Sequence, residues 1–232
     1  MASPLTTLGE HLSTPVAVSV AEYEASRRLD SRQCASWAVW GTTTGDLSIF
    51  DDAERIVPRL RKDVVLIGAN FGLDKGDAGG FRPFQNFHSA KSGGDTKLRN
   101  GVTGTVLEGA FLTDLVKDYP TKYANGLAQK IRSGSLDTDR HVRSGFEAEQ
   151  EALGLDVDTL YVPVGASTRT LWDLLVKRGV IPAEQRVFHR NFGAGPLFAG
   201  KPVTNLRHYS GSVNMVAAVE ALLAQVAQPF ER

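Results

Sequence analysis

The sequence predicts a single α/β domain built as three layers (α/β/α), with a central, mostly parallel four-stranded sheet. Short apolar runs alternate along the chain with longer stretches of helical periodicity. The composition, with 42% hydrophobic and 22% charged residues, is typical of globular proteins. The 232 residues suit one large domain, and no Pro/Ser-rich linker divides them. We therefore expect one domain over residues 1–232, with residues 1–36 as an N-terminal helical extension.

Four apolar runs are the expected strands of the sheet. They are Val64–Ile67, Ala110–Leu115, Leu160–Val164 and, with a less clear pattern, Val203–His208. Runs of Val, Ile and Leu without polar alternation are typical of parallel strands that helices cover on both faces. This is why a mostly parallel sheet is predicted.

The segments between and after these runs are the expected helices. They are Asp51–Arg61, Thr96–Leu107, Tyr119–Ile131, Asp139–Leu153, Ser167–Arg178 and Ser212–Val226. Ser167 is expected to cap its helix and Gly179 to end it. Ser212 is expected to open the last helix, whose apolar residues repeat at the helical period.

One long segment, Phe71–Gly94, does not fit the alternation of strands and helices. It is rich in glycine and carries the aromatic residues Phe81, Phe84 and Phe87. Long loops of this kind are often functional, but a surface insertion held down by its aromatic residues is an equal alternative.

Charge and cysteine content exclude several classes of protein. Lys plus Arg and Asp plus Glu each number 26, so any contact with DNA has to come from a local basic face. The single cysteine, Cys34, excludes a disulfide framework, a multi-cysteine zinc site and a four-cysteine iron–sulfur cluster within one chain. Residues 1–20 show no signal peptide, and no apolar run approaches the roughly 20 residues of a membrane span. We expect a cytoplasmic protein without contact to a membrane; the oligomeric state is not predicted, and a monomer is favoured.

Several catalytic motifs are absent from the sequence. No phosphate loop and no Gly-x-Gly-x-x-Gly fingerprint follows a predicted strand. Ser167 lacks the second glycine of a nucleophile elbow. The histidines show no His-x-x-x-His spacing. We therefore expect no metal and no cofactor.

Two strand ends carry residues of catalytic type. Gly68–Gly72 follows the first predicted strand, and His208–Asn214 precedes the last helix. Strand ends of open α/β sheets are common ligand sites. The amide of Asn70 can position a water molecule, and His208 can donate a hydrogen bond to a developing anion. Each residue alone has a structural alternative, because Asn favours turns and His often binds a buried backbone group.

These residues resemble the motifs of the uracil-DNA glycosylase superfamily. Gly68–Gly72 is similar to its Gly-x-Asn-Pro-Gly motif, and His208-Tyr209-Ser210 to its His-Pro-Ser motif. The segment Phe111–Lys117 is similar to the Thr-Asn-Leu-Val-Lys segment of several branches. The three motifs occur in the family's order, and the resemblance spans roughly residues 37–226. The lack of further cysteines places the chain outside the iron–sulfur branches.

The resemblance implies a DNA repair glycosylase that flips a nucleotide out of the stack and hydrolyses the bond from sugar to base. Asn70 would position the water, and His208 would donate to the base oxygen that gains charge. The base would contact Asp114 and Phe71 and would stack on Phe84 or Phe87. DNA would contact the segment Ser210, Gly211, Ser212 and Val213. Val213 or Met215 would be the wedge that fills the vacated stack, with a core position as an equal alternative.

The sequence departs from the family pattern at three positions. Phe71 and Tyr209 stand where the family has prolines, and Asp114 stands where many relatives have Asn. An ionised Asp only accepts hydrogen bonds, so it would favour bases with an amino group over uracil. Burial could instead keep Asp114 neutral and able to donate, or the side chain could face away from the base. We leave these three alternatives open.

Two other functions compete with DNA base excision. The chain could be a DNA-binding relative without turnover. It could also hydrolyse the N-glycosidic bond of a free nucleoside or nucleotide, which the balanced charge favours. The identity of the base is not predicted.

Overall fold

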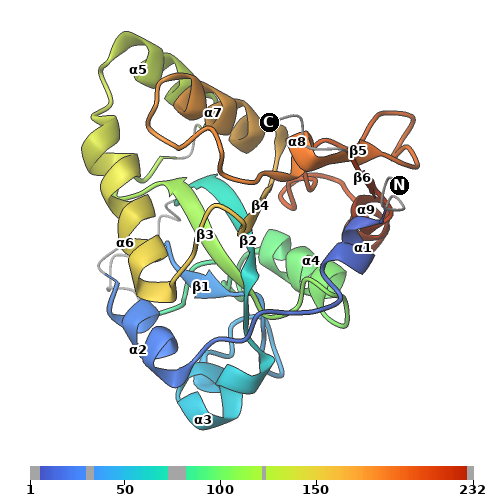
Figure 1. Ribbon diagram of the computed structural model, residues 1–232. Helices are drawn as coiled ribbons and strands as arrows, with labels where there is room; N and C mark the ends of the chain where they lie inside the picture. Colours follow the sequence, from blue (N-terminus) through green and yellow to red (C-terminus); the bar gives the residue numbers. More distant parts are fainter. Residues whose placement is uncertain (1–5, 30–33, 73–81, 122–123, 229–232) are drawn as a thin grey trace.

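A four-stranded sheet lies at the centre of the computed structural model, with helices on both of its sides (Figure 1). The structure describes residues 6–29, 34–72, 82–121 and 124–228. The strands are β1 (Ser36–Trp37), β2 (Arg61–Asn70), β3 (Ala110–Val116) and β4 (Leu160–Pro163), in the order β1-β3-β2-β4. The α/β class and three of the expected strands are confirmed.

The sheet is mixed, so the expectation of a mostly parallel sheet is wrong. Strand β2 runs parallel to β3 and to β4, but β1 pairs with β3 in the antiparallel direction. Strand β1 has only two residues, too few to show an apolar run in the sequence. The expected fourth strand, Val203–His208, forms only an isolated parallel bridge between Leu206 and Val164.

Hydrogen bonds nevertheless hold the segment Val203–His208 against the end of β4. The amide of Leu206 donates to the carbonyl of Pro163, and the amide of Gly165 donates to the carbonyl of Leu206. His208 therefore emerges beside the end of β4, as it would from a full strand.

The helices are short, and most are shorter than the sequence predicts. They are α1 (Leu8–His11), α2 (Val20–Arg28), α3 (Ala53–Ile56), α4 (Gly93–Val102), α5 (Leu127–Ser133), α6 (Ser144–Leu153), α7 (Ala166–Lys177), α8 (Phe188–Asn191) and α9 (Met215–Leu223). Single turns of 3₁₀-helix lie at η1 (Ser48–Phe50), η2 (Val57–Arg59) and η3 (Ala124–Gly126), and a π-helical turn, η4 (Asp139–Arg143), leads into α6. A small second sheet pairs β5 (Phe192–Ala194) with β6 (Val226–Ala227).

Two expected helix caps are wrong. Helix α7 begins one residue before Ser167, and its N-cap is Gly165, which has no side chain to cap with. Helix α9 begins at Met215, after Asn214, whose side chain accepts from the amide of Ala217. Asn is as good an N-cap as Ser, so composition alone does not choose between Ser212 and Asn214. Gly179 does follow the end of α7, with φ of 67°, a conformation that favours glycine.

The central sheet separates two apolar clusters. Val65 and Ile67 of β2 face a cluster with residues from α2, α5, α6 and α7. Val64 and Leu66 face a second cluster with residues from α1, α4, α8 and α9. We call these the α7 face and the α4 face of the sheet. The alternation of side chains along β2 places Gly68 and Asn70 on the α4 face.

Candidate functional site

Four chain segments end side by side at the carboxyl edge of the sheet. In β3 and β2, Asp114 pairs with Gly68. Gly165 follows β4, and a Cβ added to it would lie 3.1–3.5 Å from side-chain atoms of His208. The order across the edge is thus Asp114, Gly68, Gly165, His208. Asn70 ends β2 two residues beyond Gly68.

The side chain of Asn70 is held in one orientation by two hydrogen bonds. Its Nδ2 donates to the carbonyls of Phe71 and Thr121, at 2.8 Å each. Because both partners are acceptors, the amide nitrogen has to face them. Oδ1 therefore points away from both, and it has no partner among the residues that the structure describes. An acceptor fixed in this way can orient a water molecule.

The ring of His208 presents a hydrogen-bond donor. Its Nδ1 lies 3.2 Å from the backbone amide of Ser210 and 2.7 Å from the Ser210 hydroxyl. A backbone amide can only donate, so Nδ1 is an acceptor and the neutral ring carries its proton on Nε2. Desolvation of the ring lowers the pKa of His208 below its usual value, although the residue as a whole is exposed. His208 is thus a neutral donor through Nε2, which has no partner within the described part of the chain.

Asp114 is a buried acid with a neutral partner. Its Oδ2 accepts from Nδ2 of Asn86 at 3.0 Å, and its Oδ1 lies over Gly68, where an added Cβ would be only 2.2 Å away. Residue 68 therefore has to be glycine for Asp114 to take this position. Burial raises the pKa of Asp114 to about 7, against the lowering effect of the Asn86 hydrogen bond. Among the described residues, the hydrogen-bond partner of this carboxyl group is thus a side chain.

Of the aromatic residues predicted to stack on a base, only Phe87 lies beside Asp114. Its ring carbon Cζ would be 3.5 Å from a Cβ at Gly68. Phe84 is buried in the cluster on the α7 face, with its ring 5.4 Å from Tyr23 and 5.2 Å from Phe50. The buried Phe71 contributes its carbonyl to the positioning of Asn70. Residues 73–81 of the long segment Phe71–Gly94 lie outside the described residues.

Two further residues, Asn86 and Tyr209, contact the candidate site and were not predicted from the sequence. Asn86 bridges the Asp114 carboxylate and the carbonyl of Cys34 through its Nδ2. Tyr209 stacks on His208 at 4.7 Å and meets Phe87 edge to face at 6.3 Å. Burial raises the pKa of Tyr209 well above its usual value, and the negative charges of Asp95 and Asp114 add to this. An Asn between two Phe residues in the long loop was the one available signal for Asn86.

The segment predicted to contact DNA lies on the surface. Ser210, Gly211 and Ser212 are exposed, and Val213 packs partly against the cluster of the α4 face. Lys97 of α4 donates to the carbonyl of Gly211 at 2.8 Å, which brings a positive charge to this loop. Met215 is buried in the core, so of the two wedge candidates it is the one that takes the core position.

A second buried polar group lies on the α7 face of β3. Lys117 donates to Glu149 at 2.6 Å and to the Thr113 hydroxyl, which itself donates to the same Glu149 oxygen at 2.6 Å. The side chains of Lys117 and Glu149 are 5% and 2% exposed. We call these three residues the Lys117 network. Its charges compensate one another directly.

The described residues contain no group of three His, Cys, Asp or Glu side chains arranged to hold a metal ion. Within the same ranges, no helix is long and apolar enough to cross a membrane. In comparisons with known proteins, no family model, no curated protein and no solved structure matches this chain.

Proposed function

We propose that the chain hydrolyses the N-glycosidic bond of an altered base in DNA. The proposal rests on the hydrogen bonds that fix the Asn70 amide and the His208 ring at the edge of the sheet. Among the described residues, Oδ1 of Asn70 is a fixed acceptor without a partner, and Nε2 of the neutral His208 is a donor without a partner. Hydrolysis of this bond needs a hydrogen-bond acceptor that orients the attacking water and a donor that stabilises the leaving base, which gains negative charge.

The proposed reaction uses these two groups in one step. Oδ1 of Asn70 accepts from the attacking water, whose oxygen forms a bond to C1′ of the sugar. The bond from C1′ to the base breaks, and its electron pair stays on the base. Nε2–H of His208 donates to the base oxygen on which the charge develops. The proton lost by the water passes to the solvent or the released base.

The base would lie on the α4 face between these groups. Phe87 supplies an apolar ring beside Gly68, and the absence of a side chain at Gly68 leaves Asp114 close to this space. With a pKa of about 7, Asp114 is an acceptor above neutral pH and a donor below it. Asp114 would therefore select the base by its pairing edge, favouring amino-bearing bases when ionised.

Release of free base tests this proposal. Oligonucleotides carrying uracil, a deaminated purine or an alkylated base would be incubated with the protein and the products separated by chromatography. We expect release of at least one base, and loss of that release in Asn70→Ala. Asn100→Ala, which makes the same change at an exposed position of α4, is the matched control. No release from any substrate would reject the proposal.

The balanced charge of the chain favours a second candidate, an N-glycoside hydrolase acting on free nucleosides or nucleotides. It would use the same Asn70 and His208. Adding free nucleosides and nucleotides to the assay separates the two: the second candidate requires release from the free compounds and none from DNA. Binding of DNA without any release would indicate the non-catalytic alternative.

A further inference from the structure

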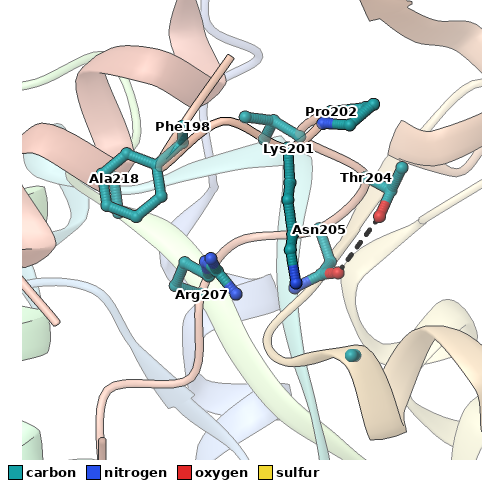
Figure 2. A pocket seen from close by; sticks show the side chains of 9 residues that line it. Phe198, Lys201, Pro202, Thr204, Asn205, Arg207 and Ala218 are labelled. Carbon is teal, nitrogen blue, oxygen red and sulfur yellow. Dashed lines mark hydrogen bonds between the residues drawn. The ribbon is translucent and has the colours of Figure 1, made fainter. Parts of the chain in front are cut away.

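A small pocket lies next to the candidate site. It is formed by Ala166 at the start of α7, Ala218 of α9 and the segment from Phe198 to Arg207. In Figure 2, Lys201 and Arg207 extend into the same space, with Phe198 on one side and Thr204 and Asn205 on the other. The pocket volume is about 170 Å³. Sites for drug-sized ligands measure about 300–1,000 Å³, so this pocket suits a single chemical group.

The lining of the pocket is positively charged. Lys201 and Arg207 both line it, and no Asp or Glu does. Neither cation forms an ion pair within the described ranges of the chain. The guanidinium of Arg207 lies over the ring of Phe198, 5.4 Å from its centroid, which holds it in place without neutralising it. Two uncompensated cations in one concavity favour an anion.

The backbone around the pocket adds to this preference. Helix α7 has 12 residues and begins at Ala166, which lines the pocket. Its N-cap, Gly165, has no side chain that could cap the first amides. The start of a helix carries a partial positive charge, which adds to the charges of Lys201 and Arg207.

We propose that this pocket, which we call the Arg207 pocket, binds a phosphoryl group. A tetrahedral oxyanion matches the fork of an Arg guanidinium and the point charge of a Lys in a space of this size. The group is either a phosphodiester of DNA or the phosphate of a free nucleotide, and both present the same oxygens to the pocket.

The pocket and the candidate site share a short stretch of backbone. Arg207 immediately precedes His208, and Ala166 immediately follows Gly165, over which the His208 ring lies. A nucleotide whose base reaches His208 would therefore present a neighbouring phosphate to Arg207. This step rests on the proposed function, whereas binding of the phosphoryl group itself does not.

The test compares two double variants with equal loss of charge. Lys201→Gln/Arg207→Gln removes the cations of the pocket. Lys177→Gln/Arg28→Gln removes an exposed Lys at the far end of α7 and an exposed Arg of α2. Binding of a fluorescein-labelled duplex with a base-free tetrahydrofuran site is measured by anisotropy over a range of salt concentrations. Circular dichroism and thermal melting check that both variants fold.

The salt dependence of binding is the readout. For a phosphodiester, the slope of log K against log salt concentration falls by about 0.9 for each phosphate that is no longer neutralised. The pocket holds one phosphoryl group, so the slope should fall by about 1 in the pocket variant. The control variant keeps the slope of the unmodified protein. Equal slopes in the two variants would overturn phosphodiester binding.

Calorimetric titration with inorganic phosphate and with deoxyuridine monophosphate distinguishes the two sources. Binding of either compound, lost in the pocket variant alone, identifies a phosphate monoester. Binding of the duplex alone, with the expected change of slope, identifies a phosphodiester. If no probe binds, or every probe binds both variants equally, the pocket proposal is wrong.

The base-release assay distinguishes a failure of the pocket proposal from a failure of the proposed function. If no base is released but the pocket variant alone loses its ligand, the proposed function fails and the pocket stands. If base is released and the pocket variant binds every probe as the control does, the pocket fails and the proposed function stands.

Discussion

Thr113 and Asp114 are neighbours in β3, yet their side chains lie on opposite faces of the sheet in opposite electrostatic situations. Thr113 belongs to the Lys117 network, in which a buried ammonium and a buried carboxylate neutralise each other at 2.6 Å. Asp114 is also buried, but its hydrogen-bond partner is the neutral amide of Asn86. Within the described residues Asp114 forms no ion pair.

This difference separates a structural group from a candidate functional one. Charges buried in water-free surroundings are costly unless they are paired, and the Lys117 network meets this condition within itself. Asp114 does not, and its pKa rises to about 7 as a result of burial. A buried acid whose pKa is raised to near neutral is a feature of many functional sites. Four predictions test the contrast.

The largest expected effect is on stability, from the α7 face. Glu149→Gln leaves the Lys117 ammonium buried without a counter-charge, so the free energy of unfolding should fall by about 3–5 kcal/mol. Urea unfolding measures it, with the exposed Glu184→Gln as the matched control. Lys117→Met/Glu149→Leu removes both charges and should recover most of the loss. A loss below about 1 kcal/mol in Glu149→Gln would show that the network has no structural role.

The second prediction concerns Asp114 and pH. Its pKa is about 7 in the folded protein and about 3.9 in the unfolded chain, so the folded state binds the proton more tightly. Stability should therefore fall as pH rises from about 4 to about 7, by up to about 4 kcal/mol. In Asp114→Asn this contribution is absent, while the other groups titrate as before. Urea unfolding of both proteins across this range measures the difference, and identical pH profiles would show that the pKa of Asp114 is not raised.

The third prediction concerns the donor at His208. If base is released, His208→Ala should lower the single-turnover rate by about 10²–10³, because one donor to the developing charge is lost. The melting temperature should change little, since the residue is exposed. The control variant Lys177→Gln/Arg28→Gln, which changes exposed residues outside the candidate site and the pocket, should keep the rate of the unmodified protein. An unchanged rate in folded His208→Ala would remove His208 from the mechanism.

The smallest expected effect is on the choice of base. Asp114→Asn replaces a carboxylate by an amide that can both donate and accept, so the preference should move toward uracil by about tenfold above pH 7. The dependence of the preference on pH near 7 should disappear. Competition between uracil and cytosine-type lesions in one assay measures this ratio. An unaltered ratio at every pH would show that Asp114 takes no part in base choice.

The strands were predictable because a strand that is buried on both faces appears in the sequence as a continuous apolar run. Val64–Ile67, Ala110–Leu115 and Leu160–Val164 are apolar runs, and they coincide with parts of β2, β3 and β4, except that β4 ends at Pro163. Local signals also placed Gly179 at the end of α7. The expected helix at Thr96–Leu107 is displaced because Ser92 caps α4 and the helix ends at Val102, shortly before Gly104 with φ of 78°.

Positions at strand ends were therefore also predictable, and their hydrogen-bond partners were not. The sequence placed Asn70 and Asp114 at the ends of strands that share one edge. The partner of the Asn70 amide is Thr121, 51 residues away, and the partner of Asp114 is Asn86, 28 residues away. Such contacts depend on how loops fold back onto the sheet. The roles of Asn70, Asp114 and His208 in a reaction stay predictions.

The sequence by itself determined the α/β class, the main strands and the candidate residues. Buried strands appear in it as apolar runs, and the polar residues that follow these runs can be read directly. The tertiary structure alone decided that β1 returns antiparallel, that Thr113 and Asp114 face different surroundings, and that Asn86 is the partner of Asp114. It also brought Lys201 and Arg207 together with the start of α7. These features arise from contacts between residues far apart in the chain, and no local period or spacing encodes them.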